Sequence, residues 1–226
     1  MATICICGID TGIGKSMVTG LLARFLHEQG KEVITQKPVQ TGSEGQSEDI
    51  LTHRRLMESG WLEEDERRLT CPYNFSFPGS PHLAAALAGK TISPDTITAT
   101  TRTLEQKYEW VLVESAGGLM VPLTDKILFL DYLAQHHYPV VLVTSPRLGS
   151  INHTLMCLEM LRSRSLKLAG LVYNLHDKAL REIVQDSQRF FSRALAGYGF
   201  ADNLVVLPEW PAQRAVRWQK IIDSCS

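Results

Sequence analysis

The sequence predicts an α/β fold in which helices cover both faces of a mostly parallel sheet. Short apolar runs alternate with segments of helical periodicity, as they do in β-α-β units. Several runs are continuously apolar, such as V-L-V at 111–113 and V-V-L-V at 140–143, which is typical of strands buried on both faces. No repeat, low-complexity tract or linker interrupts the alternation, so we expect residues 1–226 to form a single domain.

Each element is predicted from its local pattern. The apolar run Thr3 to Cys7 is the first strand, and the turn after it opens a helix at 15–28, which Gly30 ends as a left-handed cap. The second strand, Glu32 to Gln36, follows at once. Later apolar runs predict strands at Trp110 to Val113, Val140 to Thr144, Leu168 to Tyr173 and Leu204 to Leu207. Helical spacing predicts helices at 48–58, 82–88, 96–106, 150–163, 178–195 and 212–223.

Residues 60–81 have no clear period. They hold Trp61, Tyr73, Phe75 and Phe77 together with several prolines. Linkers are poor in aromatic residues, so we expect an ordered excursion from the main fold in this part of the chain.

Composition and charge exclude several classes of protein. The chain is 44% apolar and 21% charged, which is the profile of a folded globular protein. Its 23 basic and 24 acidic residues leave a net charge of −1, which speaks against a nucleic-acid partner bound by bulk electrostatics. No run reaches the roughly 18 apolar residues of a membrane span, and the first residues lack the pattern of a signal peptide. The five cysteines are odd in number and scattered, so we expect reduced thiols, a cytoplasmic location and no membrane partner.

The strongest motif is G-I-D-T-G-I-G-K-S at 8–16, which follows a strand and opens a helix. Backbone N–H groups of such a loop cradle phosphate oxygens at the positive end of a helix. Lys15 supplies a positive charge for the terminal phosphates, and the Ser16 hydroxyl can bind magnesium. The leading glycine, Gly8, stands one place earlier than in the usual spacing.

Two further positions fit a phosphate site. Glu114 directly follows the strand W-V-L-V, and a carboxylate at the carboxyl end of a buried parallel strand faces the ligand crevice and can hold Mg²⁺. Lys37 ends the second strand at the same crevice edge, where a lysine stabilises charge on a transferring phosphoryl group. Asp49 is a second candidate acid, but Glu48 stands beside it, and spacing alone does not separate Asp49 from a solvated loop acid.

Five segments together resemble dethiobiotin synthetase, in the order and spacing of that family. They are G-I-D-T-G-I-G-K-S (8–16), K-P-V-Q-T-G (37–42), P-Y-N-F-S-F-P-G-S-P-H (72–82), V-E-S-A-G-G-L-M-V-P-L (113–123) and L-G-S-I-N-H-T (148–154). With N-L at 174–175 and L-P at 207–208, the resemblance runs over nearly the whole chain.

The resemblance implies a P-loop NTPase fold and an ATP- and magnesium-dependent cyclo-ligase of biotin biosynthesis. Its substrates would be 7,8-diaminononanoate, CO2 and ATP. The reaction would pass through a carbamate of the diamine that ATP phosphorylates. The catalytic residues it implies are Thr11, Lys15 and Lys37. ATP would be bound by Gly12, Ile13, Gly14, Lys15, Ser16, Met17, Glu114, Gly117, Asn174, Leu175, Pro208, Glu209 and Trp210. Mg²⁺ would be held by Ser16, Asp49 and Glu114, and the diamine by Thr11, Lys37, Thr41, Ser150 and Asn152.

The sequence departs from the family in three places. Gly12 stands where many members carry an acid, Ser115 interrupts the usual E-G-A-G-G, and the loop between Thr41 and Asp49 is short. The chemistry implied by the resemblance needs no nucleophilic side chain and no catalytic histidine, and we expect His82, His136, His137 and His153 to face solvent or pack in loops.

The segment L-G-S-I-N-H-T opens the helix predicted at 150–163, whose free N–H groups suit a substrate carboxylate. The resemblance implies that Ser150 and Asn152 come from a partner subunit, so we expect a homodimer with shared active sites.

The alternative is a nucleotide-switched partition or positioning ATPase that acts through partner binding. Such proteins carry a lysine five places before the P-loop lysine, and here that place is Asp10. Their membrane-seeking terminal helix has a weak counterpart near Trp218, where we expect the apolar face to pack in the core instead.

Overall fold

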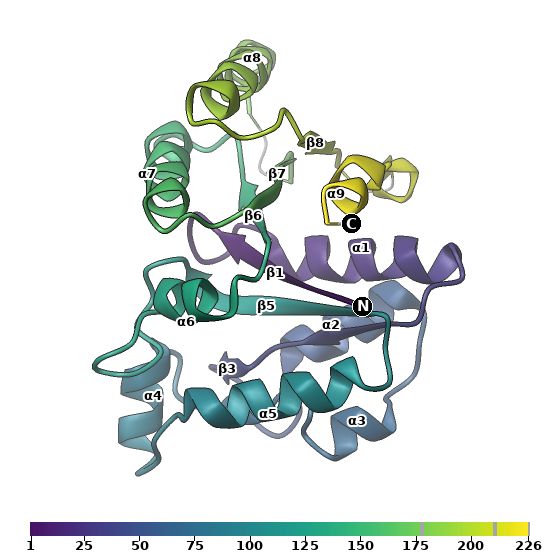
Figure 1. Cartoon of the computed structure of the whole chain (residues 1–226), viewed down its shortest axis with the longest axis vertical. Coiled ribbons are helices and arrows are strands. Elements are labelled where there is room, and N and C mark those ends of the chain that lie inside the picture. The colour runs from purple at the N-terminus through teal and green to yellow at the C-terminus, as the bar shows by residue number, and fades with distance from the viewer. Residues whose placement is uncertain (177–178, 210–211, 226) are drawn as a thin grey trace.

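The structure is a computed structural model that describes residues 1–176, 179–209 and 212–225 (Figure 1). These residues form a six-stranded sheet of order β2-β5-β1-β6-β7-β8 in which every neighbouring pair is parallel. Helices pack on both faces of this sheet, so the predicted α/β fold is confirmed. Its strands are β1 (Ala2–Gly8), β2 (Val33–Gln36), β5 (Trp110–Gly118), β6 (Val140–Thr144), β7 (Leu168–Asn174) and β8 (Leu204–Leu207).

The strand β5 is longer than predicted. We expected it to end at Val113 with Glu114 just beyond it, but its pairing with β1 continues through Ile6 and Glu114 as far as Gly8 and Gly118. The apolar pattern ends at the first polar side chain, but the hydrogen bonds between the two strand backbones continue beyond it. Glu114 is therefore fixed inside a strand of the sheet, which holds its backbone more rigidly than a loop would.

The helices agree with prediction in most places. Those expected at 15–28 and 150–163 have the observed bounds, and the one expected at 96–106 begins earlier, at Pro94, because Ser93 caps it. The start expected at 178 lies outside the described residues, and the helix there is described from Arg181. The helices are α1 (Lys15–Glu28), α2 (Glu48–Met57), α3 (Glu63–Glu66), α4 (Pro81–Leu87), α5 (Pro94–Glu105), α6 (Phe129–His136), α7 (Ser150–Ser163), α8 (Arg181–Gly197) and α9 (Gln219–Asp223).

The prediction of a single helix at 212–223 was wrong. A 3₁₀ turn at Ala212–Ala215 and the short helix α9 replace it, with residues 216–218 outside both. Trp218 at the start of α9 is 1% exposed and Ile221 is fully buried. Burial of these two apolar side chains sets the path of the chain more strongly than helical continuity does, and it confirms that this face packs in the core.

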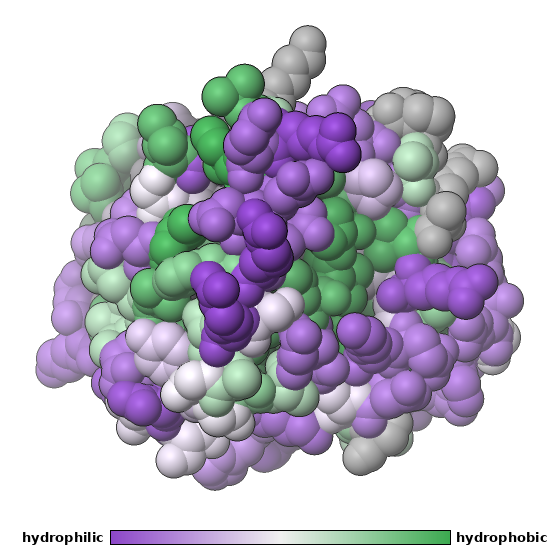
Figure 2. All heavy atoms as spheres, turned by 90° about the horizontal axis from the view of Figure 1, so that it is seen from above, coloured by the Kyte–Doolittle hydropathy of each residue, from purple (hydrophilic) through white to green (hydrophobic). Residues whose placement is uncertain are grey.

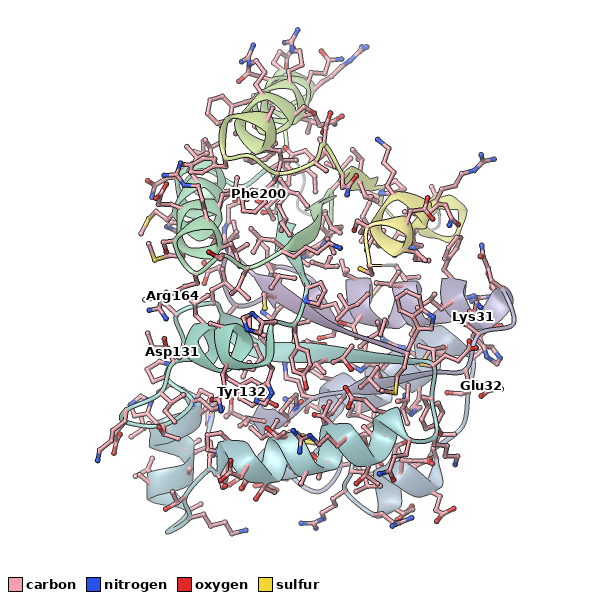
Figure 3. All side chains as sticks on the ribbon, in the orientation of Figure 1. Lys31, Glu32, Asp131, Tyr132, Arg164 and Phe200 are labelled. Carbon is pink, nitrogen blue, oxygen red and sulfur yellow. The ribbon has the colours of Figure 1, made fainter. Side chains whose placement is uncertain are left out.

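The helix α6 was not predicted. Its N-cap is Leu128 rather than a serine, threonine or aspartate. The Asp131 carboxylate stabilises the first turn by accepting a hydrogen bond from the Leu128 amide. Asp131 also accepts from Arg164, just beyond α7, and the buried ring of Tyr132 lies between α6 and α5 with its hydroxyl 3.3 Å from Thr98 Oγ1 (Figure 3). The helix is thus held by tertiary contacts that local sequence does not show.

A second, two-stranded parallel sheet pairs β3 (Val39–Thr41) with β4 (Tyr73–Phe75). Neither strand was predicted, because three residues are too few to show a period. The expectation of an ordered excursion at 60–81 is confirmed, since α3 and β4 both fall within it. This small sheet holds the segment after β2 near the carboxyl edge of the main sheet.

The core is built around the central strand β1. Cys5 and Cys7 of this strand are fully buried free thiols, as predicted, and burial raises the pKa of Cys7 to about 12. In the described ranges no helix is both long and apolar enough to cross a bilayer. Seen from above, over α7 and α8, the surface is mainly polar with apolar side chains reaching it in patches (Figure 2).

Candidate functional site

The glycine-rich loop joins β1 to α1 at the carboxyl edge of the sheet. Gly12 and Gly14 have φ angles of 69° and 92°, in the left-handed region that residues with a Cβ rarely adopt. Gly14 is the N-cap residue of α1, and a Cβ there would lie 2.1 Å from the Asn174 side-chain nitrogen. Helix α1 therefore begins directly at the loop, and the free N–H groups of such a helix start can bind phosphate.

A pocket of about 690 Å³ opens beside this loop. Its wall combines the loop with the strands β3 and β5, the start of α2 and the turn before α4. A pocket of this size suits a small-molecule substrate. It brings together the predicted residues Thr11, Gly12, Gly14, Lys15, Ser16, Met17, Lys37, Thr41, Asp49, Glu114 and Gly117.

A tight polar cluster forms the floor of the pocket. Lys37 Nζ lies 2.8 Å from Glu114 Oε1 and 2.7 Å from Asp49 Oδ2, and it also donates to the Ser115 carbonyl at 2.9 Å. The Ser16 hydroxyl lies 2.7 Å from Asp49 Oδ1 and 3.0 Å from Glu114 Oε1. Four separate parts of the chain thus meet in this cluster, and two of them supply its carboxylates.

The charges in this cluster stabilise one another. Burial alone would raise the pKa of Glu114, but the charge of Lys37 and the hydrogen bonds from His53 and Lys37 hold that pKa well below its usual range. Burial would likewise lower the pKa of Lys37, but Glu114 and Asp49 raise it above its usual range. Both groups therefore stay ionised at neutral pH.

Lys15 is the second cation of the pocket. It is 6% exposed, and its Nζ donates to the carbonyl of Asp10 at 3.0 Å. Burial, together with the nearby charge of Lys37, lowers the pKa of Lys15. The two lysines therefore balance the charges of the two carboxylates in the cluster.

Asp49 reaches the cluster because of how α2 begins. Ser47 caps the helix by accepting from the Ile50 amide, and it donates to Gln40 Oε1, which also accepts from the Asp49 amide. These contacts hold the first turn of α2 against β3. The sequence could not separate Asp49 from its neighbour Glu48, whereas the structure places only Asp49 beside Ser16.

His53 was missed by the sequence reasoning. It lies one turn after Asp49 on α2, is fully buried, and places Nε2 2.7 Å from Glu114 Oε2. The available signal was its spacing of four residues from Asp49 on a predicted helix, which puts both side chains on one face.

Other predicted residues lie outside the pocket wall. Asn174 donates to the Ile13 carbonyl at 3.0 Å from the end of β7, so it supports the loop from behind, and the Leu175 amide donates to Leu207. Ser150 is buried at the start of α7 and Asn152 is exposed on it. Pro208 and Glu209 follow β8, and Trp210 lies outside the described residues.

The donor set of the cluster fits a hard cation. Ser16, Asp49 and Glu114 supply a hydroxyl and two carboxylates, all oxygen ligands, beside a phosphate loop. Mg²⁺ is commonly held by one or two carboxylates, with waters and substrate phosphates completing its octahedron. Among the described residues no group of three or more His, Cys, Asp or Glu side chains could hold a metal ion by itself.

Comparison with known proteins agrees with this geometry. Residues 2–198 match the AAA domain family. The ATP-dependent dethiobiotin synthetase of Pasteurella multocida is 49% identical over 193 residues, covering 85% of this chain and 91% of that protein. The ATP-dependent dethiobiotin synthetase of Chlorobaculum tepidum is 48% identical over 203 residues, covering 90% and 85%.

Among solved structures, the MinC:MinD cell division protein complex of Aquifex aeolicus aligns with a TM-score of 0.58 and 17% identity, covering 100% of this chain and 94% of that one. At that identity the likeness shows the P-loop NTPase fold alone. The position of the additional lysine expected in a partition ATPase is Asp10, whose carboxylate pairs with Arg147 at 2.6 Å. The sequence relatives decide between the two readings: this chain belongs to the family of ATP-dependent dethiobiotin synthetases.

Proposed function

We propose that this chain uses ATP and Mg²⁺ to close the ureido ring of dethiobiotin from 7,8-diaminononanoate and CO2. The observation that carries the proposal is the convergence of Lys37, Asp49, Glu114 and Ser16 beside the phosphate loop, within one pocket. Family membership supplies the substrate class, and the pocket supplies a place where a phosphoryl group and an amine can meet.

The nucleotide would be held by its phosphates. The N–H groups of the loop and of the first turn of α1, from Gly12 to Met17, would bind the phosphates, and Lys15 would contact the β and γ groups. Ser16, Asp49 and Glu114 would hold Mg²⁺, which neutralises charge on the β- and γ-phosphate oxygens when bound.

The base would be bound by Asn174, Leu175, Pro208, Glu209 and Trp210, as the resemblance implies. Asn174 already supports the loop through Ile13, so reading an adenine edge would require its amide to serve two partners or to turn. Its four hydrogen-bonding sites make the first arrangement possible.

Ring closure follows from a carbamate. One amine of the diamine adds to CO2 and loses a proton, and the resulting carbamate oxygen attacks the γ-phosphorus as ADP leaves. The second amine then attacks the carbamoyl carbon of this mixed anhydride, loses a proton and expels phosphate, which closes the cyclic urea. Thr11, Lys37 and Thr41 would surround the carbamate, with Lys37 stabilising charge on the transferring group.

The distal carboxylate of the diamine would bind a second copy of the chain. Ser150 and Asn152 are not part of the pocket wall of their own subunit, while Leu148 and Met156 beside them are 88% and 59% exposed. Exposed apolar side chains around a helix N-terminus suit a homodimer that shares its sites. Sedimentation at micromolar concentration should give twice 25.2 kDa. A fully active monomer would contradict the shared site.

The remaining proposals concern the chain as a whole. We take residues 1–226 as one P-loop domain, because the main sheet combines early strands, β1 and β2, with late ones, β7 and β8. We place the protein in the cytoplasm, which the five free cysteines support.

Product analysis tests the proposed function directly. The protein is incubated with the diamine, bicarbonate and Mg²⁺ with each nucleoside triphosphate in turn, and dethiobiotin, ADP and phosphate are measured. We expect one phosphate released per ring closed. Nucleotide hydrolysis that is indifferent to the diamine, with no cyclic urea formed, would overturn the proposal.

A further inference from the structure

We propose that His53 is a positioning residue that fixes the Glu114 carboxylate with a single oxygen facing the pocket. This inference rests on the proposed role of Glu114 in holding Mg²⁺, and it adds a residue that the sequence motifs do not contain.

The two oxygens of Glu114 have different partners. Oε1 accepts from Lys37 at 2.8 Å and from Ser16 at 3.0 Å, both on the pocket side. Oε2 faces His53 Nε2 at 2.7 Å, on the side of α2. Glu114 is itself 1% exposed, so these side chains are the main partners of its two oxygens.

The proton between His53 and Glu114 belongs to the imidazole. An ionised carboxylate only accepts hydrogen bonds, so Nε2 must be the donor. Among the described residues nothing bonds to Nδ1, so Glu114 is the hydrogen-bond partner of this ring. Nε2 directs its N–H at Oε2 and offers the carboxylate a single, fixed contact.

The same helix holds both acids of the cluster. Asp49 and His53 stand one turn apart on α2, so the helix places Asp49 Oδ1 beside Ser16 and, through His53, fixes the rotation of Glu114. With Oε2 occupied, Glu114 can offer only Oε1 to a cation. A carboxylate that is free to rotate would alternate between one-oxygen and two-oxygen binding, which suits the rigid octahedron of Mg²⁺ poorly.

The test compares three substitutions at this position. His53→Leu removes the donor, His53→Gln can place an amide nitrogen near the position of Nε2, and His53→Asn is too short to reach Oε2. Leu56→Ala is the matched control, because Leu56 is a buried residue of the same helix that packs on Gly20 of α1 rather than on Glu114.

Mn²⁺ binding to the protein with ADP is measured by electron paramagnetic resonance, alongside the Mg²⁺ concentration for half-maximal activity and the melting temperature of the apo protein. Loss of a residue that orients a metal ligand typically weakens metal affinity about 10- to 100-fold. We expect that loss in His53→Leu and His53→Asn, recovery to within about threefold in His53→Gln, and unchanged Mn²⁺ affinity in Leu56→Ala despite a lower melting temperature.

The inference is overturned if His53→Leu melts earlier but binds Mn²⁺ as the wild type does. Should His53→Leu fail to fold, equal affinities for the Gln and Asn variants would overturn it as well. Glu114→Gln separates this result from failure of the proposed function: unchanged Mn²⁺ affinity in that variant removes the metal role of Glu114 itself, whereas a weakened Glu114→Gln beside an unaffected His53→Leu rejects only the role of His53.

Discussion

Lys37 keeps its charge at a position that water hardly reaches. It is 4% exposed, and its ammonium group is bonded to two carboxylates and a carbonyl. Removing one partner of a buried ion pair typically destabilises a protein by about 3–5 kcal/mol, because the other charge is left uncompensated. Lys37 therefore serves the fold as well as the proposed chemistry, and its loss should be visible in both.

Lys37→Met should lower kcat at least about a hundredfold, the loss expected when one electrostatic donor to a transition state is removed. It should also lower the melting temperature, since Glu114 and Asp49 lose their shared cation. Steady-state kinetics and thermal unfolding measure the two effects. Lys31→Met is the control, because the Lys31 side chain makes an exposed ion pair with Glu109, so its loss should change neither quantity. A change in turnover below threefold would contradict the assignment of Lys37.

A second buried pair lies at the other end of α2, where Arg54 makes two hydrogen bonds of 2.8 Å to the Asp65 carboxylate. Burial alone would raise the pKa of Asp65, but Arg54, the Thr70 hydroxyl and the Leu62 amide lower it below its usual value of 3.8. A lowered folded-state pKa gives stability that is present above about pH 4 and is lost as the pH falls through the folded value.

Urea unfolding of the wild type and of Asp65→Asn between pH 2 and pH 7 tests this sign. The difference in free energy of unfolding should be largest near neutral pH and should shrink as the solution becomes strongly acidic. A difference that stayed constant over this range would show that the charge of Asp65 does not matter.

At the scale of elements, segments with a clear local apolar pattern were predictable and segments without one were not. The helices 15–28 and 150–163 and the strands β6 and β8 were predicted with their observed bounds, because apolar spacing determines them locally. The strands β3 and β4 and the helix α6 depend on contacts with distant residues. The same reason explains the site: Lys15 and Ser16 follow from a motif, whereas His53 acquires its partner only when α2 docks on β5.

The docking of α1 on α2 should tolerate no added atoms. A Cβ at Gly20 would lie 2.7 Å from Leu56 Cδ1 and 3.3 Å from the Cα of His53. Overpacking of this kind typically costs about 1–3 kcal/mol, which exceeds the gain of roughly 1 kcal/mol from replacing a helical glycine by alanine. We expect Gly20→Ala to lower the melting temperature, because the added Cβ strains the contact between α1 and α2.

The control for this prediction is Gly197→Ala in α8. A Cβ at Gly197 meets no atom within 4 Å, so the substitution should leave stability unchanged or improve it slightly. If both alanine variants melted above the wild type, the close contact between α1 and α2 would not be present in solution.

For the whole molecule, the site joins parts of the chain that are otherwise connected only through the sheet. Ser16, Lys37, Asp49 and Glu114 come from α1, the end of β2, α2 and β5. A ligand that contacts all four should therefore stabilise the folded state as a unit, by an amount that depends on its concentration.

ADP with Mg²⁺ should raise the melting temperature by roughly 5–10 °C at a hundred times its dissociation constant. ADP with a chelator should raise the melting temperature less. In Asp49→Asn the difference in melting temperature between ADP with Mg²⁺ and ADP with a chelator should be smaller. Thermal unfolding followed by circular dichroism makes the measurement. Equal shifts with and without Mg²⁺ would contradict a metal site in this cluster.

The central place of β1 has a kinetic consequence. Ile4 pairs with Leu112 and Cys5 with Val140. During synthesis, β1 therefore cannot pair until strands more than a hundred residues later have been made. At ribosomal rates of about 5–20 residues per second, that delay is on the order of 5 to 20 seconds. During that time the run T-I-C-I-C has no β-strand neighbours from the finished sheet, and closing such long loops is slow in refolding as well. The newly made chain should therefore need a chaperone to keep this strand from pairing with other copies, and refolding yield from denaturant should fall as protein concentration rises.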